Sequence, residues 1–124
     1  NLLLDTHVLL WWLDEPTRLS SESHDAIAEP RNRVSVSAAA AWEIFLKKSL
    51  GKLDAPDDLE GALGDAGFDQ LFITIRHAER TSHLPAIHQD PFDRMQIAQA
   101  QVEGLLLVTR DETVMRYDVP VIRA

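Results

Sequence analysis

Residues 91–111 read PFDRMQIAQAQVEGLLLVTRD and carry the pattern that decides the fold. Pro91 suits the first turn of a helix, where its missing N–H would have no partner, and Gly104 suits the residue at which a helix ends. The apolar run Leu105–Val108 follows at once and is typical of a buried strand. A helix joined by one glycine to a continuously apolar strand predicts a parallel sheet with helices on both faces.

The same alternation of apolar runs and helical patterns extends from this unit to both ends of the chain. Strands are predicted at Leu2–Leu4, Arg33–Val36, Gln70–Ile75, Leu105–Val108 and Val119–Ile122. Helices are predicted at His7–Leu13, Ser21–Glu29, Ser37–Leu50, Leu59–Ala66, Arg76–His83 and Pro91–Glu103. No internal repeat, low-complexity segment or interdomain linker interrupts this order, so we expect one α/β domain over residues 1–124.

The composition narrows the class of protein. The chain has 124 residues, of which 45% are hydrophobic, which is enough for one core. It has no cysteine, which excludes disulfides, thiolate metal sites and cysteine nucleophiles. No apolar stretch approaches the ~20 residues of a membrane span, and Asp5 interrupts the first apolar run too early for a signal peptide. We therefore expect a cytoplasmic protein without a membrane anchor.

The net charge of −8, from 20 acidic and 12 basic residues, is unusual for a protein that binds nucleic acid. Part of the excess acid can form a solvated, solubilising surface. Another part can cluster in a pocket, where it would need divalent cations. Both interpretations can hold together.

Four acids occupy positions where an open parallel sheet binds ligands, at the carboxyl ends of its strands. Asp5 directly follows the first strand, and Asp111 follows the fourth after two residues. Asp93 lies in the first turn of the helix before that fourth strand. Glu43 lies about two turns into the helix after the second strand, where the small side chains of Ala38–Ala41 would let the helix approach the sheet. We expect the four carboxylates to converge.

Such carboxylates repel one another and raise each other's pKa unless cations are present. Oxygen ligands suit Mg²⁺ or Mn²⁺. Two such ions roughly 3.5–4 Å apart can activate a water and stabilise the leaving oxygen of a phosphodiester.

Each acid also has a purely structural interpretation. Asp5 can cap a helix, Asp93 can meet the dipole of its own helix, and Asp111 can cap a turn. Glu43 is the most informative, because an acid on an otherwise apolar helix is expected to be buried and to need a partner. The structural candidate for that partner is Lys47, four residues on.

Four stretches of the chain resemble the PIN domain and, within it, the VapC-type toxins of bacterial and archaeal toxin–antitoxin pairs. They are LLLDTHVLLWWL at 2–13, SAAAAWEIFLKKSLGKL at 37–53, HLPAIHQDPFDRMQIAQAQVEGLLLVTRDE at 83–112 and the closing YDVPVI at 117–122. The block at 83–112 is the specific one. Together the stretches span nearly the whole chain in the family's order.

The resemblance implies a three-layer α/β/α sandwich around a short, mainly parallel sheet. It implies RNA cleavage with Mg²⁺ or Mn²⁺, a dimer in common with much of the family, and inhibition by a small cognate antitoxin. The family's acidic quartet falls on Asp5, Glu43, Asp93 and Asp111. Thr6 and Thr109 fall where the family often has small hydroxyl residues near the metal site.

Other residues admit more than one interpretation. His83, His88 and Asp90 could form a transition-metal triad, but their spacing matches no zinc motif and we favour Asp90 as a helix cap. Trp11 and Trp12 belong to an apolar cluster too dense for one buried helix face, so core packing and a protein–protein surface both remain open. The basic residues that are candidates for phosphate contacts are Arg94, Arg110, Lys47, Lys48 and Lys52.

Two other functions are compatible with some of these features. A phosphatase of the haloacid-dehalogenase type also has an Asp at the end of its first strand, but it needs a second Asp two residues on, where this chain has His7. A non-catalytic module could use the acids to hold a basic peptide. The complete quartet argues against this second alternative.

Overall fold

The computed structural model describes all residues, 1–124. Its strands are β1 (Leu2–Leu4), β2 (Val34–Ser37), β3 (Asp69–Leu71), β4 (Leu106–Thr109) and β5 (Val121–Arg123). Its α-helices are α1 (Thr6–Asp14), α2 (Ser21–Ala28), α3 (Ala38–Ser49), α4 (Leu59–Ala66), α5 (Ile75–Thr81) and α6 (Pro91–Glu103). Short 3₁₀ turns lie at Pro16–Arg18 and Val114–Arg116. No helix combines the length and the apolar character that a membrane crossing requires.

The strands form one sheet in the order β3-β2-β1-β4-β5, and all four pairs are parallel. Leu4, at the end of β1, lies beside Val36 of β2 and Val108 of β4. The three central strands therefore end at the same edge of the sheet. This confirms the parallel sheet expected from the sequence.

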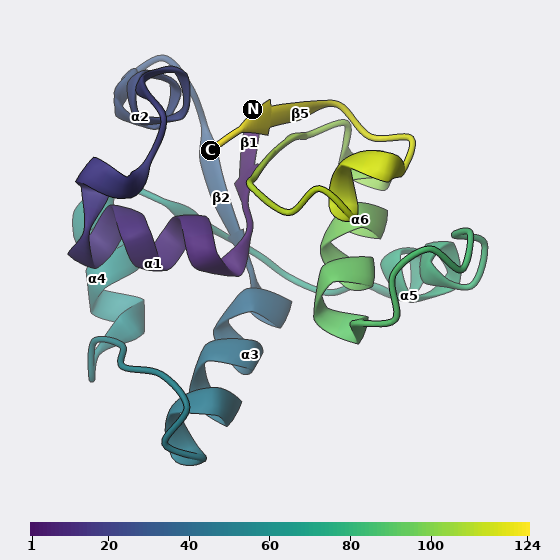
Figure 1. Ribbon diagram of the computed structural model, residues 1–124, viewed down its shortest axis with the longest axis horizontal. Helices are drawn as coiled ribbons and strands as arrows, with labels where there is room; N and C mark the ends of the chain where they lie inside the picture. The colour runs from purple at the N-terminus through teal and green to yellow at the C-terminus, as the bar shows by residue number, and fades with distance from the viewer.

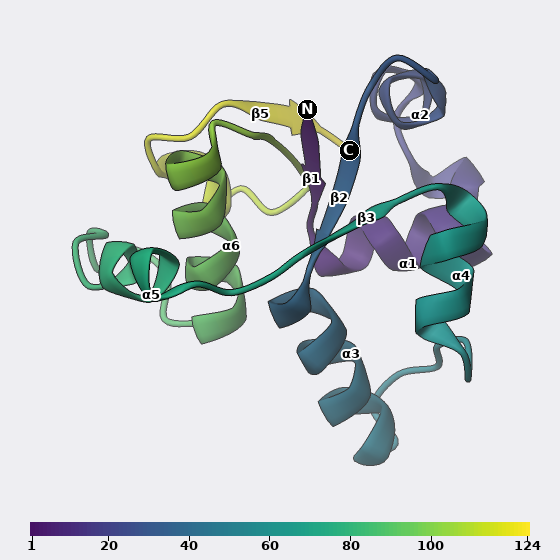
Figure 2. The same ribbon diagram turned by 180° about the vertical axis from the view of Figure 1, so that it is seen from behind.

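Side chains that alternate along β1 supply the two hydrophobic cores. Leu2 and Leu4 belong to a core shared with residues of α1, α2, α3 and α4. Leu3 belongs to a second core on the other face, built mainly with α6. Each fully buried leucine contributes roughly 1.5–3 kcal/mol. Figures 1 and 2 show α1, α2 and α4 on one side of the strands and α5 and α6 on the other, so the three-layer α/β/α sandwich is confirmed.

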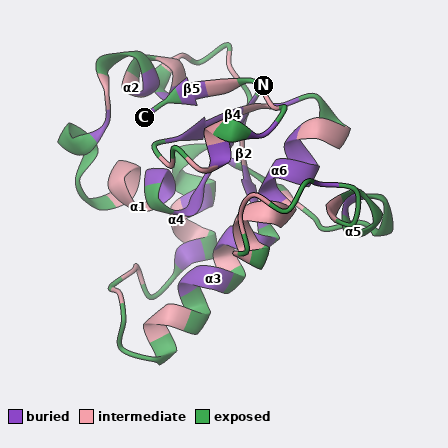
Figure 3. Ribbon diagram, turned by 45° about the vertical axis from the view of Figure 1, so that its right-hand side comes forward, coloured by how far each residue is buried: buried purple, intermediate pink, exposed green.

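Most helix ends follow the expected residues. Ser37 caps α3 by accepting a hydrogen bond from the Ala39 N–H, and Asp90 caps α6 by accepting from the Phe92 and Asp93 N–H groups. Gly104 ends α6 with φ +67°, a left-handed conformation that costs glycine little. In Figure 3 the buried colour lies on central strands such as β2 and β4, and helices such as α3 carry both buried and exposed residues.

The strand predicted at Gln70–Ile75 was wrong in its second half. Strand β3 ends at Leu71, and Thr74 instead caps α5 by accepting a hydrogen bond from the His77 N–H at 3.2 Å. Phe72 and Ile75 are 70% and 88% exposed. Their apolar character marks an exposed surface rather than a continued strand.

Candidate active site

The four acids predicted from the sequence line one cleft of about 450 Å³. Asp5 follows β1, Asp111 follows β4, Glu43 lies on the helix after β2, and Asp93 lies in the first turn of α6. Asp90 is a fifth acid in the wall, and Trp11 is the one apolar lining residue. The edge at which the central strands end thus gathers carboxylates from four separate segments.

Both carboxylate oxygens of Asp5 are held by hydrogen bonds. Oδ1 accepts from the Val8 N–H at 3.0 Å, which caps α1, and Oδ2 accepts from the Thr109 hydroxyl at 2.5 Å. Burial raises the pKa of Asp5, while the hydrogen bonds from Thr109 and Val8 oppose that rise. The predicted helix cap is therefore confirmed for Asp5, and its carboxylate also lines the cleft.

Glu43 is buried and makes two short contacts. Its Oε1 accepts from the Thr6 hydroxyl at 2.6 Å, and its Oε2 lies 2.6 Å from the Lys47 Nζ. The hydrogen bond to Glu43 raises the pKa of Lys47. The partner expected for a buried acid is thus Lys47, and Thr6 is a second partner.

Asp93 is a second acid of the cleft whose pKa is raised. Burial, followed by the charges of Asp90, Asp5 and Glu43, raises its pKa to about 7, although the nearby His88 opposes the rise. Five carboxyl groups line the cleft, whereas Lys47 and Arg110 are its only lysine and arginine.

Asp111 also combines two contacts. Its Oδ1 accepts from the Thr113 N–H at 2.8 Å, which is the turn cap foreseen for it, and its Oδ2 lies 3.3 Å from the His88 Nε2. The Asp111 N–H in turn donates to the Thr109 hydroxyl oxygen at 3.1 Å. Thr109 therefore connects Asp5 to Asp111, which gives it a place beside the acids, as the resemblance implied.

His88 is the site residue that sequence reasoning underrated. Its Nε2 lies 2.8 Å from the Asp93 Oδ2, and one ligand atom from each of His88, Asp93 and Asp111 lies within 4.8 Å of the other two. His83 is not part of this group, so the triad of His83, His88 and Asp90 does not form. The one feature of the sequence that could have pointed to His88 is its position two residues before Asp90, the residue that caps α6.

The candidate phosphate contacts differ in where they lie. Lys47 and Arg110 line the cleft, whereas Arg94, Lys48 and Lys52 do not. The Arg110 guanidinium lies 4.4 Å from the centre of the Trp11 ring and donates to the carbonyl oxygens of Ala124 and Arg18.

Arg94 holds the loop before α6 rather than facing the acids. Its guanidinium donates to the carbonyl oxygens of Thr81 and Pro85, both at 2.9 Å. Lys48 donates to the Ala55 carbonyl and to Asp57, and none of these three residues lines the cleft.

The two tryptophans have separate surroundings. Trp12 packs against His24 and Phe68, with ring centres 5.2 and 6.2 Å apart, so core packing accounts for it. Trp11 lines the acidic cleft and also a neighbouring hollow of about 540 Å³. It therefore forms the wall between two surface depressions.

The donor set fits a hard divalent cation. Carboxylate oxygens are the ligands that such ions prefer. Burial and the neighbouring carboxylates raise the pKa of Asp93, and a nearby cation would favour its ionised form.

Comparison with known proteins gives consistent results. Residues 2–120 match the sequence model of the PIN domain. The chain is 31% identical over 119 positions to Ribonuclease VapC22 of Mycobacterium tuberculosis, covering 90% of this chain and 87% of that protein. A chain in the VapBC2 structure from Rickettsia felis, bound to a promoter DNA fragment, superposes with a TM-score of 0.73 at 13% identity, covering 98% and 96% of the two chains. A chain of FitAcB from Neisseria gonorrhoeae gives 0.69 at 22%, covering 99% and 97%. At these identities the structures establish a shared fold.

Proposed function

This chain belongs to the PIN-domain family, as a ribonuclease of the VapC toxin kind, and we propose that Asp5, Glu43, Asp93 and Asp111 form its catalytic site for divalent cations. The observation that carries the proposal is that four acids from four separate segments line one cleft. A haloacid-dehalogenase phosphatase is not supported, because His7 stands where its second Asp belongs. A purely non-catalytic module does not fit a ribonuclease family.

Mg²⁺ or Mn²⁺ bound by these carboxylates would supply an activated water and would offset charge on the phosphodiester. The residues of the chain prepare that site. Thr109 and Val8 fix the direction of the Asp5 carboxylate, and Thr6 fixes that of Glu43. A preorganised carboxylate loses little freedom when it binds, which favours both affinity and correct geometry.

The RNA backbone approaches a chain of net charge −8, so basic groups inside the cleft matter most. Lys47 lies there with its side chain 36% exposed, and Arg110 lies against Trp11 on the same wall. We assign phosphate contacts to these two residues. Arg94 does not line the cleft and its guanidinium donates to loop carbonyls, so we assign it a role in holding the loop.

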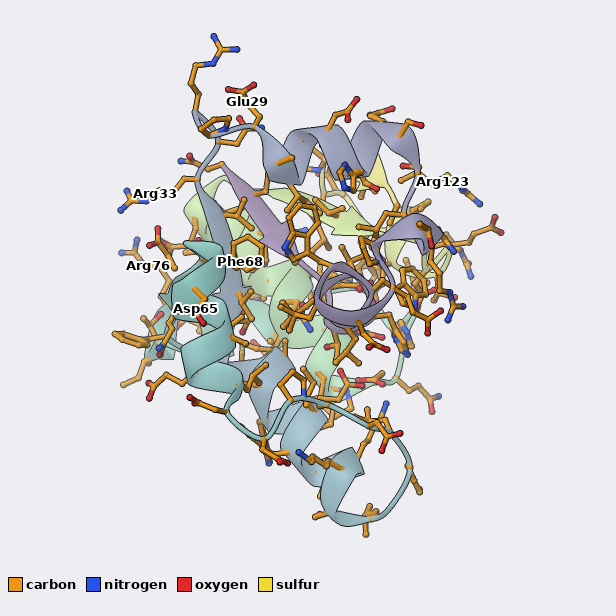
Figure 4. All side chains as sticks on the ribbon, turned by 90° about the vertical axis from the view of Figure 1, so that its left-hand side faces the viewer. Glu29, Arg33, Asp65, Phe68, Arg76 and Arg123 are labelled. Atoms are coloured by element: carbon orange, nitrogen blue, oxygen red, sulfur yellow. The ribbon has the colours of Figure 1, made fainter.

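The proposal is tested by replacing Asp93 with Asn and measuring cleavage of a single-stranded RNA with Mg²⁺ or Mn²⁺. We expect at least a hundredfold loss, because an amide is a poorer ligand and carries no charge. Asp65→Asn is the matched control, since Asp65 is an exposed acid on α4, labelled in Figure 4, outside the cleft. Wild-type activity in Asp93→Asn, or full activity of the wild type with excess chelator, would remove the metal site from the reaction.

We further propose that a small antitoxin inhibits the enzyme by entering the cleft. The solved structures that share the fold include a toxin–antitoxin complex from Klebsiella pneumoniae, which supports a partner of this kind. The hollow beside Trp11 has a mixed lining, with Leu10 and Leu13 near Asp14, Glu15 and Asp54, so it suits a segment that carries both apolar and basic side chains. The adjoining acids suit an arginine or a lysine.

We also propose that two copies associate through an apolar face formed by α3 and residues 72–75, which lead from β3 into the first residue of α5. The most exposed large apolar side chains of the chain all lie there, and they are Trp42, Phe45, Leu46, Leu50, Phe72, Ile73 and Ile75. Trp42 and Ile73 line a common hollow of about 370 Å³. Trp42, Phe45 and Phe72 are 49–70% exposed, so each offers part of the roughly 150–250 Å² that a whole aromatic side chain buries.

A further inference from the structure

Gln96 is a buried amide one turn beyond Asp93 on α6. Its side chain is 1% exposed, its Nε2 donates to the Thr6 hydroxyl oxygen at 3.3 Å, and its Oε1 has no hydrogen-bond partner. A buried carbonyl without a partner destabilises the folded state, so native proteins rarely retain one without a compensating benefit.

The contact with Gln96 constrains the proton of Thr6. A hydroxyl has one hydrogen to donate and two lone pairs that accept. Because the Gln96 N–H donates to the Thr6 oxygen, the Thr6 hydrogen is directed elsewhere, and the Glu43 Oε1 lies 2.6 Å away. The other oxygen of Glu43 is bound by Lys47. A chain of hydrogen bonds thus runs from α6 through α1 to the acid on α3.

We propose that Gln96 is a positioning residue for Glu43, acting through Thr6. The amide orients the Thr6 hydroxyl, and the hydroxyl holds the carboxylate that faces the cleft. This inference rests on the proposed role of Glu43 as a cation ligand. The proposed role also explains why the chain retains an amide whose oxygen has no partner. An apolar side chain at position 96 would avoid the cost of burying that oxygen, but it would not orient the Thr6 hydroxyl.

Gln99 provides a matched control within the same helix. It is fully buried and its Oε1 is also unpartnered. Its Nε2, however, contacts the Phe72 carbonyl at 3.4 Å and the His77 Nδ1 at 3.5 Å, away from the cleft. The two glutamines differ mainly in what their amide nitrogens reach.

The test compares Gln96→Met with Gln99→Met, because methionine keeps the length of the side chain and removes the amide. We expect Gln96→Met to melt no lower than the wild type, since the unpartnered oxygen is gone. We expect it to lose about tenfold in kcat, which corresponds to ~1.4 kcal/mol, and to bind Mn²⁺ more weakly by calorimetry. Gln99→Met should keep the wild-type rate and affinity. Gln96→Leu repeats the test if the methionine variant folds poorly.

A double-mutant cycle separates orientation from general packing. In a Thr6→Val background, Gln96→Met should cause no further loss, because the hydroxyl it directs is absent. Additive losses, or wild-type rate and Mn²⁺ affinity in Gln96→Met, would overturn the proposal.

A crystal structure of Gln96→Met tests the inference without any cation. We expect the Thr6 hydroxyl to turn from Glu43 or the Glu43 carboxylate to shift. An unchanged contact between the two would also overturn the proposal. A wild type that neither binds Mn²⁺ nor cleaves RNA would contradict the proposed function instead, and this structure would still decide the role of Gln96.

Discussion

The Nε2 of His88 lies 2.8 Å from the Asp93 Oδ2 and 3.3 Å from the Asp111 Oδ2. The His88 Nδ1 accepts a hydrogen bond from the Asp90 N–H at 3.3 Å, so the neutral ring carries its hydrogen on Nε2 and directs it toward the carboxylates. The imidazole thus gives these two acids a donor from within the chain. A cation bound by the same oxygens would compete with it.

Divalent cations should stabilise the fold by relieving repulsion among the carboxylates. In a thermal melt with Mn²⁺ at a hundred times its Kd, the free energy of unfolding should rise by about 2.7 kcal/mol. Asp93→Asn should show a smaller shift in Tm, and a monovalent salt of equal ionic strength should produce almost none. No shift in the wild type at millimolar Mn²⁺ would count against a shared cation site.

Without divalent cations, stability should fall as pH rises from about 4 to about 7. The pKa of Asp93 is raised from 3.8 to about 7, so over this range the folded protein binds more protons than the unfolded chain. The raised pKa of Asp5 acts in the same direction. The measurement is Tm against pH in the presence of a chelator. Asp93→Asn should flatten the slope, and an equally steep slope in that variant would assign the effect to other groups.

An antitoxin that inserts a basic side chain among the acids should inhibit mainly through that contact. Replacing this arginine or lysine with alanine should restore RNA cleavage more than it weakens the complex, because the apolar contact beside Trp11 remains. Activity and Kd are measured on the same variant, with an exposed basic residue elsewhere on the antitoxin as control. Complete inhibition by the alanine variant would indicate that the RNA groove is blocked at another place.

The apolar face should hold two copies together. Ile75→Ser should shift the protein from dimer toward monomer in sedimentation velocity, because Ile75 is 88% exposed and its replacement removes apolar contact without opening the core. Trp42→Ser should act in the same way. The exposed Asp65→Asn serves as control. A wild type that sediments as a monomer at micromolar concentration would contradict this proposal.

The convergence of the acids follows from rules that operate on sequence alone. Asp5 and Asp111 end neighbouring parallel strands, and the edge of such a sheet brings them together. Glu43 was identifiable because an acid on an apolar helix needs partners. These positions depend on local pattern and on topology, which the sequence expresses directly.

The position of His88 depends on contacts distant in sequence. The Tyr117 hydroxyl accepts from the His88 N–H at 2.6 Å across 29 residues, and Arg94 holds the carbonyls of Thr81 and Pro85. These contacts set the path of the loop that brings the imidazole to the acids. No local periodicity encodes such a path, just as none distinguished the exposed residues after β3 from a continued strand.

The hydrogen bond from the Val8 N–H to Asp5 has a consequence for how cells escape a toxin. Asparagine at position 5 would preserve the cap of α1, whereas alanine would remove it and cost about 1 kcal/mol of stability. Selection for cells that survive expression of the toxin should therefore yield two kinds of inactive variant. Substitutions such as Asp93→Asn would leave an abundant, folded decoy that still sequesters its inhibitor, while Asp5→Ala would give a chain more often unfolded and more readily cleared by proteases.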